Sequence, residues 1–422
     1  MKTVIRSVTF VLLLLLLFVF GFAWRDVRQG HLPTASTLAS MIDMSVSQSK
    51  VTPEQEFEQN YERIRTDYYK SVQSEKLTYA GMEGLMASLG DPHTMFMEPQ
   101  LASDFSLETN ASFVGVGARL STDELGAKTI NVFENGPAEI AGLKAGDIIT
   151  AVNGKSVVGS DIDDIVSKIR GEEGTTVKLK LLRGDSKTPI SISVKRERVE
   201  TPTVSETKVV PGTQFGYFQI SSFAEPTARQ FDEQVDKLEK QHIKGLVIDL
   251  RDNPGGLLDT AKEMLSRFFD NKTVVTIKGR NGQEETVTTD SGDVHNFNYP
   301  IVILLNEDSA SASEIFSGVM QDYKKATLVG THSYGKASVQ NVIPLVGGSS
   351  AKITIAHYFL PRGGGANDIS RKVDEEGEYI SGGLQPDVKA DLDLDSVKPI
   401  VFGDITTDTQ LQKAVQVLQQ KQ

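Results

Sequence analysis

Cysteine is absent from this sequence of 422 residues. Disulfide bonds and thiolate chemistry are therefore excluded, and the compartment cannot be inferred from cysteine usage. The sequence also lacks a His-Glu-x-x-His motif or a comparable ligand cluster, so it predicts no metal and no other cofactor. Basic charge is not in excess either, because the formal net charge is −12 at pH 7, which argues against nucleic acid as a partner. What is present is a 39% hydrophobic content, enough for the cores of two or more domains.

A long apolar run occurs only at the N-terminus. Lys2 and Arg6 precede the run from Val8 to Trp24, which has the length of a signal sequence or of a short membrane span. Positive charge on this flank predicts that the rest of the chain lies outside the cytoplasm. We expect residues 1–24 to be an uncleaved single-pass anchor in the cell membrane. Cleavage after Ala23, which would give a secreted protein, is the alternative.

Polar residues 25–52 are predicted to be a tether, and residues 53–104 a domain of helices. The helical spacing is carried by Phe57, Tyr61 and Ile64. A second helix is predicted from Tyr79 to Leu89, where Gly90-Asp91-Pro92 is a stop signal. His93 follows, and as a lone histidine in a turn it receives no catalytic role. The apolar faces of these helices have no large core of their own, so we expect them to pack on the body of the protein or on a second copy.

Residues 105–198 are predicted to form a separate small domain. A predicted strand, Ile148–Val152, ends at Asn153-Gly154, a hairpin signal, and a helix is expected from Asp161 to Arg170. Alternating apolar residues at 177–181 and at 190–194 predict two further strands. The order of these elements, with Gly-Pro-Ala at 136–138 and Gly-Leu-Lys-Ala-Gly-Asp at 142–147, resembles a PDZ domain. A PDZ domain binds the C-terminal carboxylate of a peptide on free backbone N–H groups and adds the peptide as a strand. The resemblance places this peptide-binding loop at Val114, Gly115, Val116 and Gly117.

From residue 199 to about 400 the pattern becomes mixed α/β. The run Gly245–Leu250 is predicted to be a buried strand, and it leads into Arg251-Asp252-Asn253-Pro254-Gly255-Gly256 and then a helix. Functional loops are expected at the C-terminal ends of such strands. Gly255 and Gly256 leave backbone N–H groups uncovered, so both are candidates for half of an oxyanion hole, facing the N–H of Ala312. An ordinary turn is the alternative for Asn-Pro-Gly-Gly.

Ser311 lies at a predicted turn between a strand, Ile301–Leu305, and a helix, Ser313–Tyr323. The first N–H groups of a helix have no partner, and together with the helix dipole they suit an oxygen that becomes anionic. A serine needs a base to act as a nucleophile, and a desolvated lysine can provide one. Lys336 lies 25 residues further on, after another predicted strand, Ala326–Gly330.

Four blocks of sequence now resemble one family, the C-terminal processing peptidases or tail-specific proteases. The blocks are Asp249–Gly256, Ser309–Ile315, Tyr334–Gln340 and the inserted PDZ-like region. The resemblance spans about residues 53–400. It implies an α+β multidomain fold with N-terminal helices, a PDZ domain and a protease core of the mixed α/β, crotonase/Clp-like type. It also implies a serine endopeptidase that cleaves protein substrates after recognising their accessible C-termini.

Residue by residue, the resemblance makes Ser311 the nucleophile, Lys336 the general base and Gln340 the residue that orients the lysine. Ser309 and Ser313 are the rivals of Ser311. Asp322 also matches a family position and is interpreted as structural support. Residues 401–422 are predicted to form a final amphipathic helix, and we expect a homodimer in which this helix pairs with the N-terminal helices of a partner chain.

Three other classes compete with this hypothesis. Gly330–Ala337 differs by one residue from a phosphate-binding P-loop, but Ala337 replaces the metal-binding hydroxyl, and a strand is predicted after Lys336. A Ser-His-Asp hydrolase using His332 or His357 lacks a Gly-x-Ser-x-Gly elbow. The main alternative is a non-catalytic PDZ scaffold that binds peptides without cleaving them.

Overall fold

The computed structural model describes residues 51–184, 188–292, 294–362, 368–393 and 399–422. The chain divides into one unit up to Ala80 and a second from Gly81 onward. The apolar run expected to be an anchor, and the predicted tether up to residue 50, lie outside the described residues. Among the residues that are described, no helix is long and apolar enough to cross a membrane.

Helix α3, Pro53–Asp67, begins as the sequence predicts, with Pro53 in the first turn and Thr52 as the N-cap. The Thr52 hydroxyl accepts from the Gln55 N–H, and the Gln55 side chain accepts from the Thr52 N–H. No residue of α3 is buried, and Phe57 and Ile64 remain exposed. The expectation that this helix lacks a core of its own is therefore confirmed. The next helix, α4, runs from Ser74 to Ala87.

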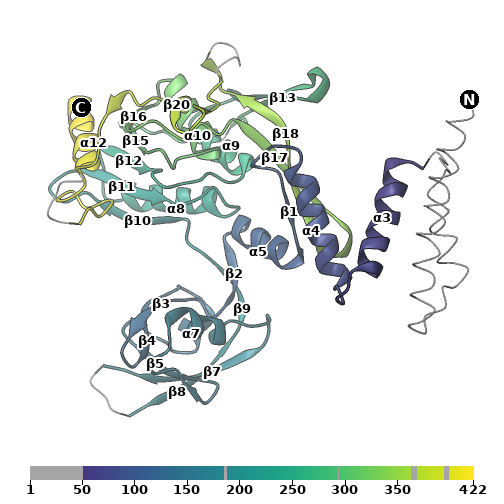
Figure 1. Ribbon diagram of the computed structural model, residues 1–422. Helices are drawn as coiled ribbons and strands as arrows, with labels where there is room; N and C mark the ends of the chain where they lie inside the picture. The colour runs from purple at the N-terminus through teal and green to yellow at the C-terminus, as the bar shows by residue number, and fades with distance from the viewer. Residues whose placement is uncertain (1–50, 185–187, 293, 363–367, 394–398) are drawn as a thin grey trace, which may run out of the picture. The chain divides into compact units, whose positions relative to one another are not determined.

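The PDZ-like region is a sheet of short antiparallel strands with two helices (Figure 1). It follows helix α5, Pro99–Thr109, which runs across the predicted boundary at residue 105. Strand β2, Ser112–Gly115, pairs outside this sheet with β9, Glu197–Glu200. The sheet has the order β3-β4-β5-β7-β8, and β6 pairs with β5. The elements are β3 Ala118–Asp123, β4 Gly126–Val132, α6 Pro137–Ile140, β5 Ile148–Val152, β6 Lys155–Ser156, α7 Ile162–Ile169, β7 Thr176–Leu182 and β8 Ile190–Lys195.

The core of the second unit is a six-stranded sheet in the order β10-β11-β12-β15-β16-β21. Neighbours from β11 to β21 are parallel, and β10 is antiparallel to β11. The strands are β10 Val204–Val209, β11 Phe215–Ile220, β12 Gly245–Asp249, β15 Ile301–Leu305, β16 Ala326–Gly330 and β21 Val388–Lys389. Every residue of β12, β15 and β16 is buried, as expected for parallel strands covered on both faces. The predicted mixed α/β core is confirmed.

Helices cover both faces of this sheet (Figure 1). On one face lie α8 Thr227–Glu239, α9 Leu258–Ser266 and α10 Ala312–Asp322. On the other lies α12, Thr409–Gln420, whose Leu411 and Leu418 are buried against Val302 and other side chains of the strands. The predicted C-terminal helix exists, but its apolar side packs on the sheet of its own chain. The expectation that this helix pairs with a partner chain is therefore wrong.

A second, antiparallel sheet has the order β1-β18-β13-β14, with β17 also paired to β18. Its strands are β1 Met95–Met97, β13 Thr273–Gly279, β14 Glu284–Thr288, β17 Ser338–Pro344 and β18 Ser350–Phe359. A short hairpin, β19 Lys372–Val373 and β20 Tyr379–Ser381, follows in the chain. The pairing of β1 with β18 brings the turn after α4 next to the segment that carries Lys336.

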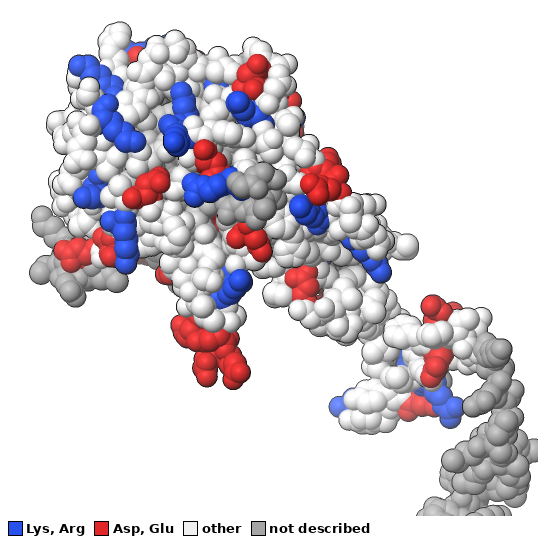
Figure 2. Space-filling model, turned by 90° about the horizontal axis from the view of Figure 1, so that it is seen from above, with Lys and Arg blue, Asp and Glu red and all other residues white. Residues whose placement is uncertain are grey.

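Charged side chains of both signs are interspersed on the face shown in Figure 2.

Candidate active site

Ser311 is the N-cap residue of α10, and its backbone is strained, with φ 55° and ψ −116°. Positive φ is uncommon for a residue other than glycine, and strain of this kind is concentrated at functional sites. The side chain is half-buried, at the end of the buried strand β15 and its connection. The predicted strand-to-helix turn is present, and it aims the N-terminal N–H groups of α10 at the surroundings of Ser311.

The hydroxyl groups of the two rival serines, Ser309 and Ser313, are engaged in hydrogen bonds that hold the loops around this turn. Ser309 and Ser313 are both fully buried. The Ser309 hydroxyl donates to the Leu250 carbonyl at 2.8 Å, and the Ser313 hydroxyl donates to the Asn253 carbonyl at 2.9 Å. Of the three serines, only Ser311 has its side chain partly open to solvent.

Gly255, in the turn after β12, lies directly against Ser311. A Cβ atom on Gly255 would stand 2.8 Å from the Ser311 Cβ and 2.8 Å from the Ala312 nitrogen. The Gly255 N–H donates to the Asn253 side chain at 2.9 Å, so this predicted oxyanion donor is already engaged. Within the described ranges, no acceptor is recorded for the N–H groups of Gly256 and Ala312. These two remain as free main-chain donors.

One buried carboxylate joins the Ser311 turn to the Lys336 loop. Glu314 is fully buried in the first turn of α10. Its Oε2 atom accepts from the N–H groups of Ser311 and Lys336, each at 2.9 Å. Its Oε1 atom accepts from the Ser333 hydroxyl at 2.5 Å and from the Gly335 N–H at 2.7 Å. Burial raises the pKa of Glu314, while these hydrogen bonds act in the opposite direction.

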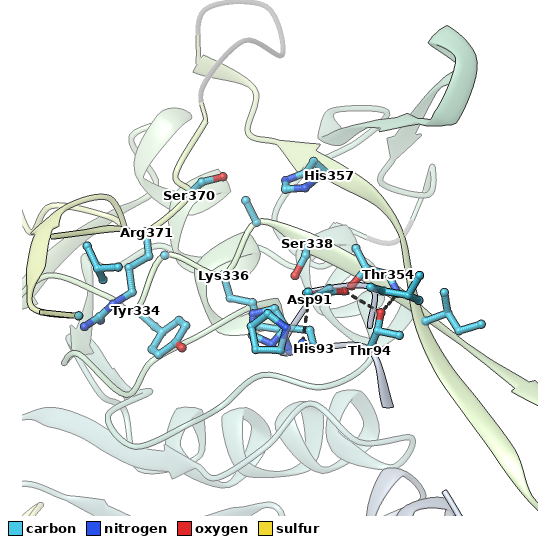
Figure 3. A pocket seen from close by; sticks show the side chains of 18 residues that line it. Asp91, His93, Thr94, Tyr334, Lys336, Ser338, Thr354, His357, Ser370 and Arg371 are labelled. Carbon is cyan, nitrogen blue, oxygen red and sulfur yellow. Dashed lines mark hydrogen bonds between the residues drawn. The ribbon is translucent and has the colours of Figure 1, made fainter. Parts of the chain in front are cut away.

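Lys336 lies between β16 and β17 and lines a cavity of about 930 Å³. Burial lowers the pKa of Lys336 below its ordinary value, and the charge of Lys352 adds to this effect. Glu314 and Asp91 act in the opposite direction. In the described part of the chain, no hydrogen bond joins the Lys336 amine to the Ser311 hydroxyl. Figure 3 shows the Lys336 side chain next to His93 in this cavity.

The sequence did not indicate this contact with the turn after α4. Asp91 accepts from the His93 N–H at 3.0 Å and from the Thr94 hydroxyl at 2.6 Å. Burial opposes the shift, but hydrogen bonds from Thr354, Thr94 and the His93 backbone lower the pKa of Asp91 to about 2. Burial, followed by the charge of Lys336, lowers the pKa of His93. His93 was interpreted as a turn residue, and it is one, but its ring also faces the lysine.

Gln340 does not hold Lys336 in this structure. It lies in β17, and its amide donates to the Ser338 hydroxyl at 2.7 Å and to the Thr354 hydroxyl at 3.3 Å. No hydrogen bond between Gln340 and Lys336 is recorded in the described ranges. The orienting role of Gln340 stays a prediction.

Asp322, at the end of α10, pairs with Arg362 at 2.9 Å and is buried at its side chain. Its carboxylate also accepts from the Arg362 N–H at 2.8 Å, which ties the loop after β18 to the helix. Burial raises the pKa of Asp322, and Arg362 acts in the opposite direction. These contacts are those of a structural support.

The geometry of the site does not support the two rival enzyme classes, the Ser-His-Asp hydrolase and the P-loop protein. The His332 ring stacks on Tyr379 at 3.9 Å between centroids, and no hydrogen bond from His332 or His357 to Ser311 is recorded among the described residues. The predicted strand after Lys336 is β17, so no helix N-terminus is present there to bind a phosphate. No group of three or more His, Cys, Asp or Glu side chains that could hold a metal ion occurs in the residues described.

The predicted peptide-binding loop is split between a strand and a connection. Val114 and Gly115 belong to β2 and pair with β9. Val116 and Gly117 form the connection to β3, where Gly117 has φ 77°. Strand β3 is at the edge of its sheet, and α7 packs beside it. An open strand edge beside a helix is the arrangement that a peptide can extend by adding one more strand.

The structure combines a serine on a strained turn, a lysine with a lowered pKa and a separate sheet with the element order of a PDZ domain. Comparison of the chain with known families gives the class of protein. Residues 214–390 match peptidase family S41, residues 131–183 match the PDZ domain, and residues 22–100 match the N-terminal domain of the activating protease CtpB. The chain is 36% identical over 352 residues to the carboxy-terminal processing protease CtpB of Bacillus subtilis (strain 168), covering 81% of this chain and 72% of the relative.

A second relative is CtpA of the same organism, 34% identical over 369 residues, with 85% of this chain and 75% of the relative covered. Among solved structures, a photosystem II D1 C-terminal processing protease is 27% identical with a TM-score of 0.45, covering 87% of this chain and 98% of that one. The chain therefore belongs to the carboxy-terminal processing serine proteases of peptidase family S41, with a PDZ domain, as the sequence blocks predicted.

Proposed function

We propose that this protein is an extracytoplasmic endopeptidase that cleaves protein substrates through a Ser311/Lys336 dyad and recognises their C-terminal tails with its PDZ domain. The observation that supports the dyad is the shared carboxylate of Glu314. By accepting from the N–H groups of both Ser311 and Lys336, it fixes the two loops against each other. Such positioning is a large part of what a nucleophile and its base require.

The chemistry follows from the positions of these groups. Neutral Lys336 takes the proton of the Ser311 hydroxyl as the oxygen attacks the scissile carbonyl, and then delivers it to the leaving amine. The N–H groups of Gly256 and Ala312 stabilise the oxyanion, a role worth about 3–4 kcal/mol per donor. Water then hydrolyses the acyl-enzyme. Proton transfer requires the amine to come within hydrogen-bond distance of Ser311, so the Lys336 side chain must turn from the position beside His93.

The dyad is tested by cleavage of an unfolded protein with an apolar C-terminus. Ser311→Ala and Lys336→Ala should each abolish cleavage, whereas Lys389→Ala, which removes an exposed lysine of the same core, should not. Undiminished cleavage by Ser311→Ala would exclude the mechanism. A non-catalytic PDZ scaffold, the alternative function, would bind substrate equally well with and without Lys336 and would cleave nothing.

The PDZ domain is assigned to the substrate tail because β3 offers an open edge next to α7. Cleavage of the same protein should fall when its C-terminal carboxylate is amidated, and it should lose this dependence in a variant without residues 105–198. If the deletion leaves both rate and specificity unchanged, the PDZ domain does not select the tail.

Location and assembly form the last part of the proposal. The apolar run at 8–24, after Lys2 and Arg6, supports a membrane anchor with the catalytic part outside the cytoplasm. Exposed Phe57 and Ile64 on α3 support a homodimer through the N-terminal helices. Digestion by protease added outside intact cells tests the location. Sedimentation of the soluble part, with Phe57→Ser and Ile64→Ser together, tests the dimer.

A further inference from the structure

Arg371 is a half-buried cation on the wall of the cavity that Lys336 lines (Figure 3). Its guanidinium lies over the ring of Tyr334, 5.1 Å from the centroid, and over that of Tyr379, at 5.4 Å. In the described ranges, no carboxylate lies within ion-pair distance of it. Other arginines with shielded side chains have partners within the chain: Arg251 pairs with Asp249, Arg267 pairs with Asp232, and buried Arg196 donates to the Ile169 carbonyl at 2.7 Å. Arg371 therefore carries a charge that the described chain does not neutralise.

The position of Arg371 is held from several directions. The backbone N–H of Arg371 donates to the carbonyl of Gly335 at 2.8 Å, and Gly335 directly precedes Lys336. The Tyr379 hydroxyl donates to the Gly382 carbonyl at 2.8 Å, and its ring stacks on His332. A guanidinium stacked on rings in this way loses little further freedom when a carboxylate binds it.

The rest of the cavity adds little negative charge that would repel an anion. Asp91 is its only acidic lining residue among those described. The Asp91 carboxylate is already occupied by the Thr94 hydroxyl and the His93 N–H. The acidic residues of the turn between β19 and β20 are exposed, and Asp374 there accepts from the Glu376 and Glu378 N–H groups.

The chemistry indicates which part of a substrate reaches this cavity. Because Lys336 returns its proton to the leaving amine, the space next to its side chain lies on the leaving-group side of the scissile bond. We propose that Arg371 binds a carboxylate of the leaving segment, the part of the substrate C-terminal to the cut. This inference rests on the proposed Ser311/Lys336 mechanism and adds a second preference to it, separate from the PDZ domain. The carboxylate is an acidic side chain close to the cut or the α-carboxylate of a short leaving segment.

The test uses a peptide that the full protein cuts at one bond. Versions are made with Glu or Gln at each of the first three positions after the bond, each with a free or an amidated C-terminus. If Arg371 forms a charge-assisted hydrogen bond with the substrate, the peptide that has the recognised carboxylate should be cleaved with a kcat/KM about 10- to 100-fold higher than its amide counterpart. A Glu-over-Gln preference assigns the site to a side chain, and an acid-over-amide preference assigns it to the α-carboxylate.

Arg371→Gln should abolish this preference while cleaving the neutral peptide about as well as the wild type, which also shows that the variant is folded. Lys372→Gln is the matched control: it removes the same charge from the next residue, which is exposed and does not line the cavity. Arg371→Glu should reverse the preference towards Lys at the same position. Amidation also weakens PDZ binding, so the acid-to-amide ratio is compared between wild type and Arg371→Gln, where the PDZ contribution cancels.

Two results would overturn the inference: a wild type that cleaves all versions equally, or an unchanged carboxylate preference in Arg371→Gln. Failure of the underlying mechanism gives a different result, because Ser311→Ala would then still cut the neutral peptide. Cleavage that depends on Ser311 but ignores the carboxylates rejects only the role of Arg371.

Discussion

The backbone N–H groups of Ser311 and Lys336 donate to the same oxygen atom, Oε2 of Glu314, at 2.9 Å each. The two residues are 25 positions apart, in different loops, and neither depends on its own side chain for this link. The strained backbone of Ser311 is therefore held by the same group that sets the position of the lysine.

Glu314→Gln should lower both stability and turnover. The glutamine amide has nearly the shape of the carboxylate, in which both oxygens accept hydrogen bonds. In the variant, the NH₂ group replaces one of these oxygens, so the N–H or O–H donors on that side lose their acceptor. We expect a loss of about 2–3 kcal/mol in the free energy of unfolding, because buried donors become unsatisfied. We also expect kcat to fall more than KM rises, since Ser311 loses its restraint. Urea unfolding and steady-state kinetics measure the two effects, with Glu285→Gln on an exposed strand as control. Normal turnover in Glu314→Gln would show that the shared carboxylate is dispensable.

The pH profile of cleavage should report the charges around Lys336. The neutral amine is the active form, so kcat/KM rises as the pH rises through the pKa of Lys336. Burial and the charge of Lys352 hold this pKa below 10.5. Lys352→Gln removes a like charge, which raises the pKa of Lys336 and moves the rising limb to higher pH.

The charge of Asp91 has the opposite effect on Lys336. Asp91→Asn should therefore lower the pKa of Lys336 and move the limb to lower pH. Lys389→Gln, which changes an exposed charge elsewhere, should leave the profile in place. Shifts of the same sign in Lys352→Gln and Asp91→Asn would mean that Lys336 is not the group that titrates.

Local patterns in the sequence were sufficient to predict the strand-to-helix turn that carries Ser311. The bounds of β15 and β16 are those predicted, and α10 begins one residue before its predicted start. Continuous apolar runs and helical spacing are properties of a few neighbouring residues, so a single sequence contains them. The Asn253–Gly256 turn was recognised for the same reason.

Long-range contacts could not be read in this way. His93 reaches Lys336 only because β1 pairs with β18, and nothing in either segment encodes that pairing. The Gly255 N–H was expected to be free for an oxyanion, but it donates to the side chain of Asn253 two residues earlier. This local hydrogen bond competes with the predicted role as an oxyanion donor. Helix α12 was recognised by its amphipathic pattern, which does not say which surface covers the apolar side.

Gly255→Ala should reduce activity without unfolding the protein. With φ +98° and its Cβ position only 2.6 Å from the Ala310 carbonyl oxygen, the site cannot take a methyl group unless the Ser311 turn moves. A displacement of about 1 Å can cost roughly 100-fold in rate, which is the loss we expect in kcat/KM. Gly282→Ala is the matched control, because Gly282 has φ +76° and nothing within 4 Å of its Cβ position. Equal effects of the two substitutions would attribute the loss to backbone strain alone.

Asp408→Ala should destabilise the core by removing a partner of a buried charge. Arg251 and Asp408 are both fully buried, and the guanidinium binds the carboxylate through two hydrogen bonds, at 2.9 and 2.6 Å. Asp408 is also the N-cap of α12, accepting from the Leu411 N–H at 3.0 Å. Because Asp249 still pairs with Arg251, the buried charge stays compensated, and we expect the lost hydrogen bonds to cost about 1–3 kcal/mol in the free energy of unfolding. Urea unfolding is the measurement.

The surface pair of Asp391 with Lys389, at 3.6 Å, provides the control, since Asp391→Ala should cost less than about 1 kcal/mol. Arg251 directly precedes the turn that carries Gly255 and Gly256, so the loss of Asp408 should also lower kcat/KM under conditions where the protein is still folded. A stability loss without any change in kcat/KM would show that the buried ion pair supports the C-terminal helix but not the oxyanion loop.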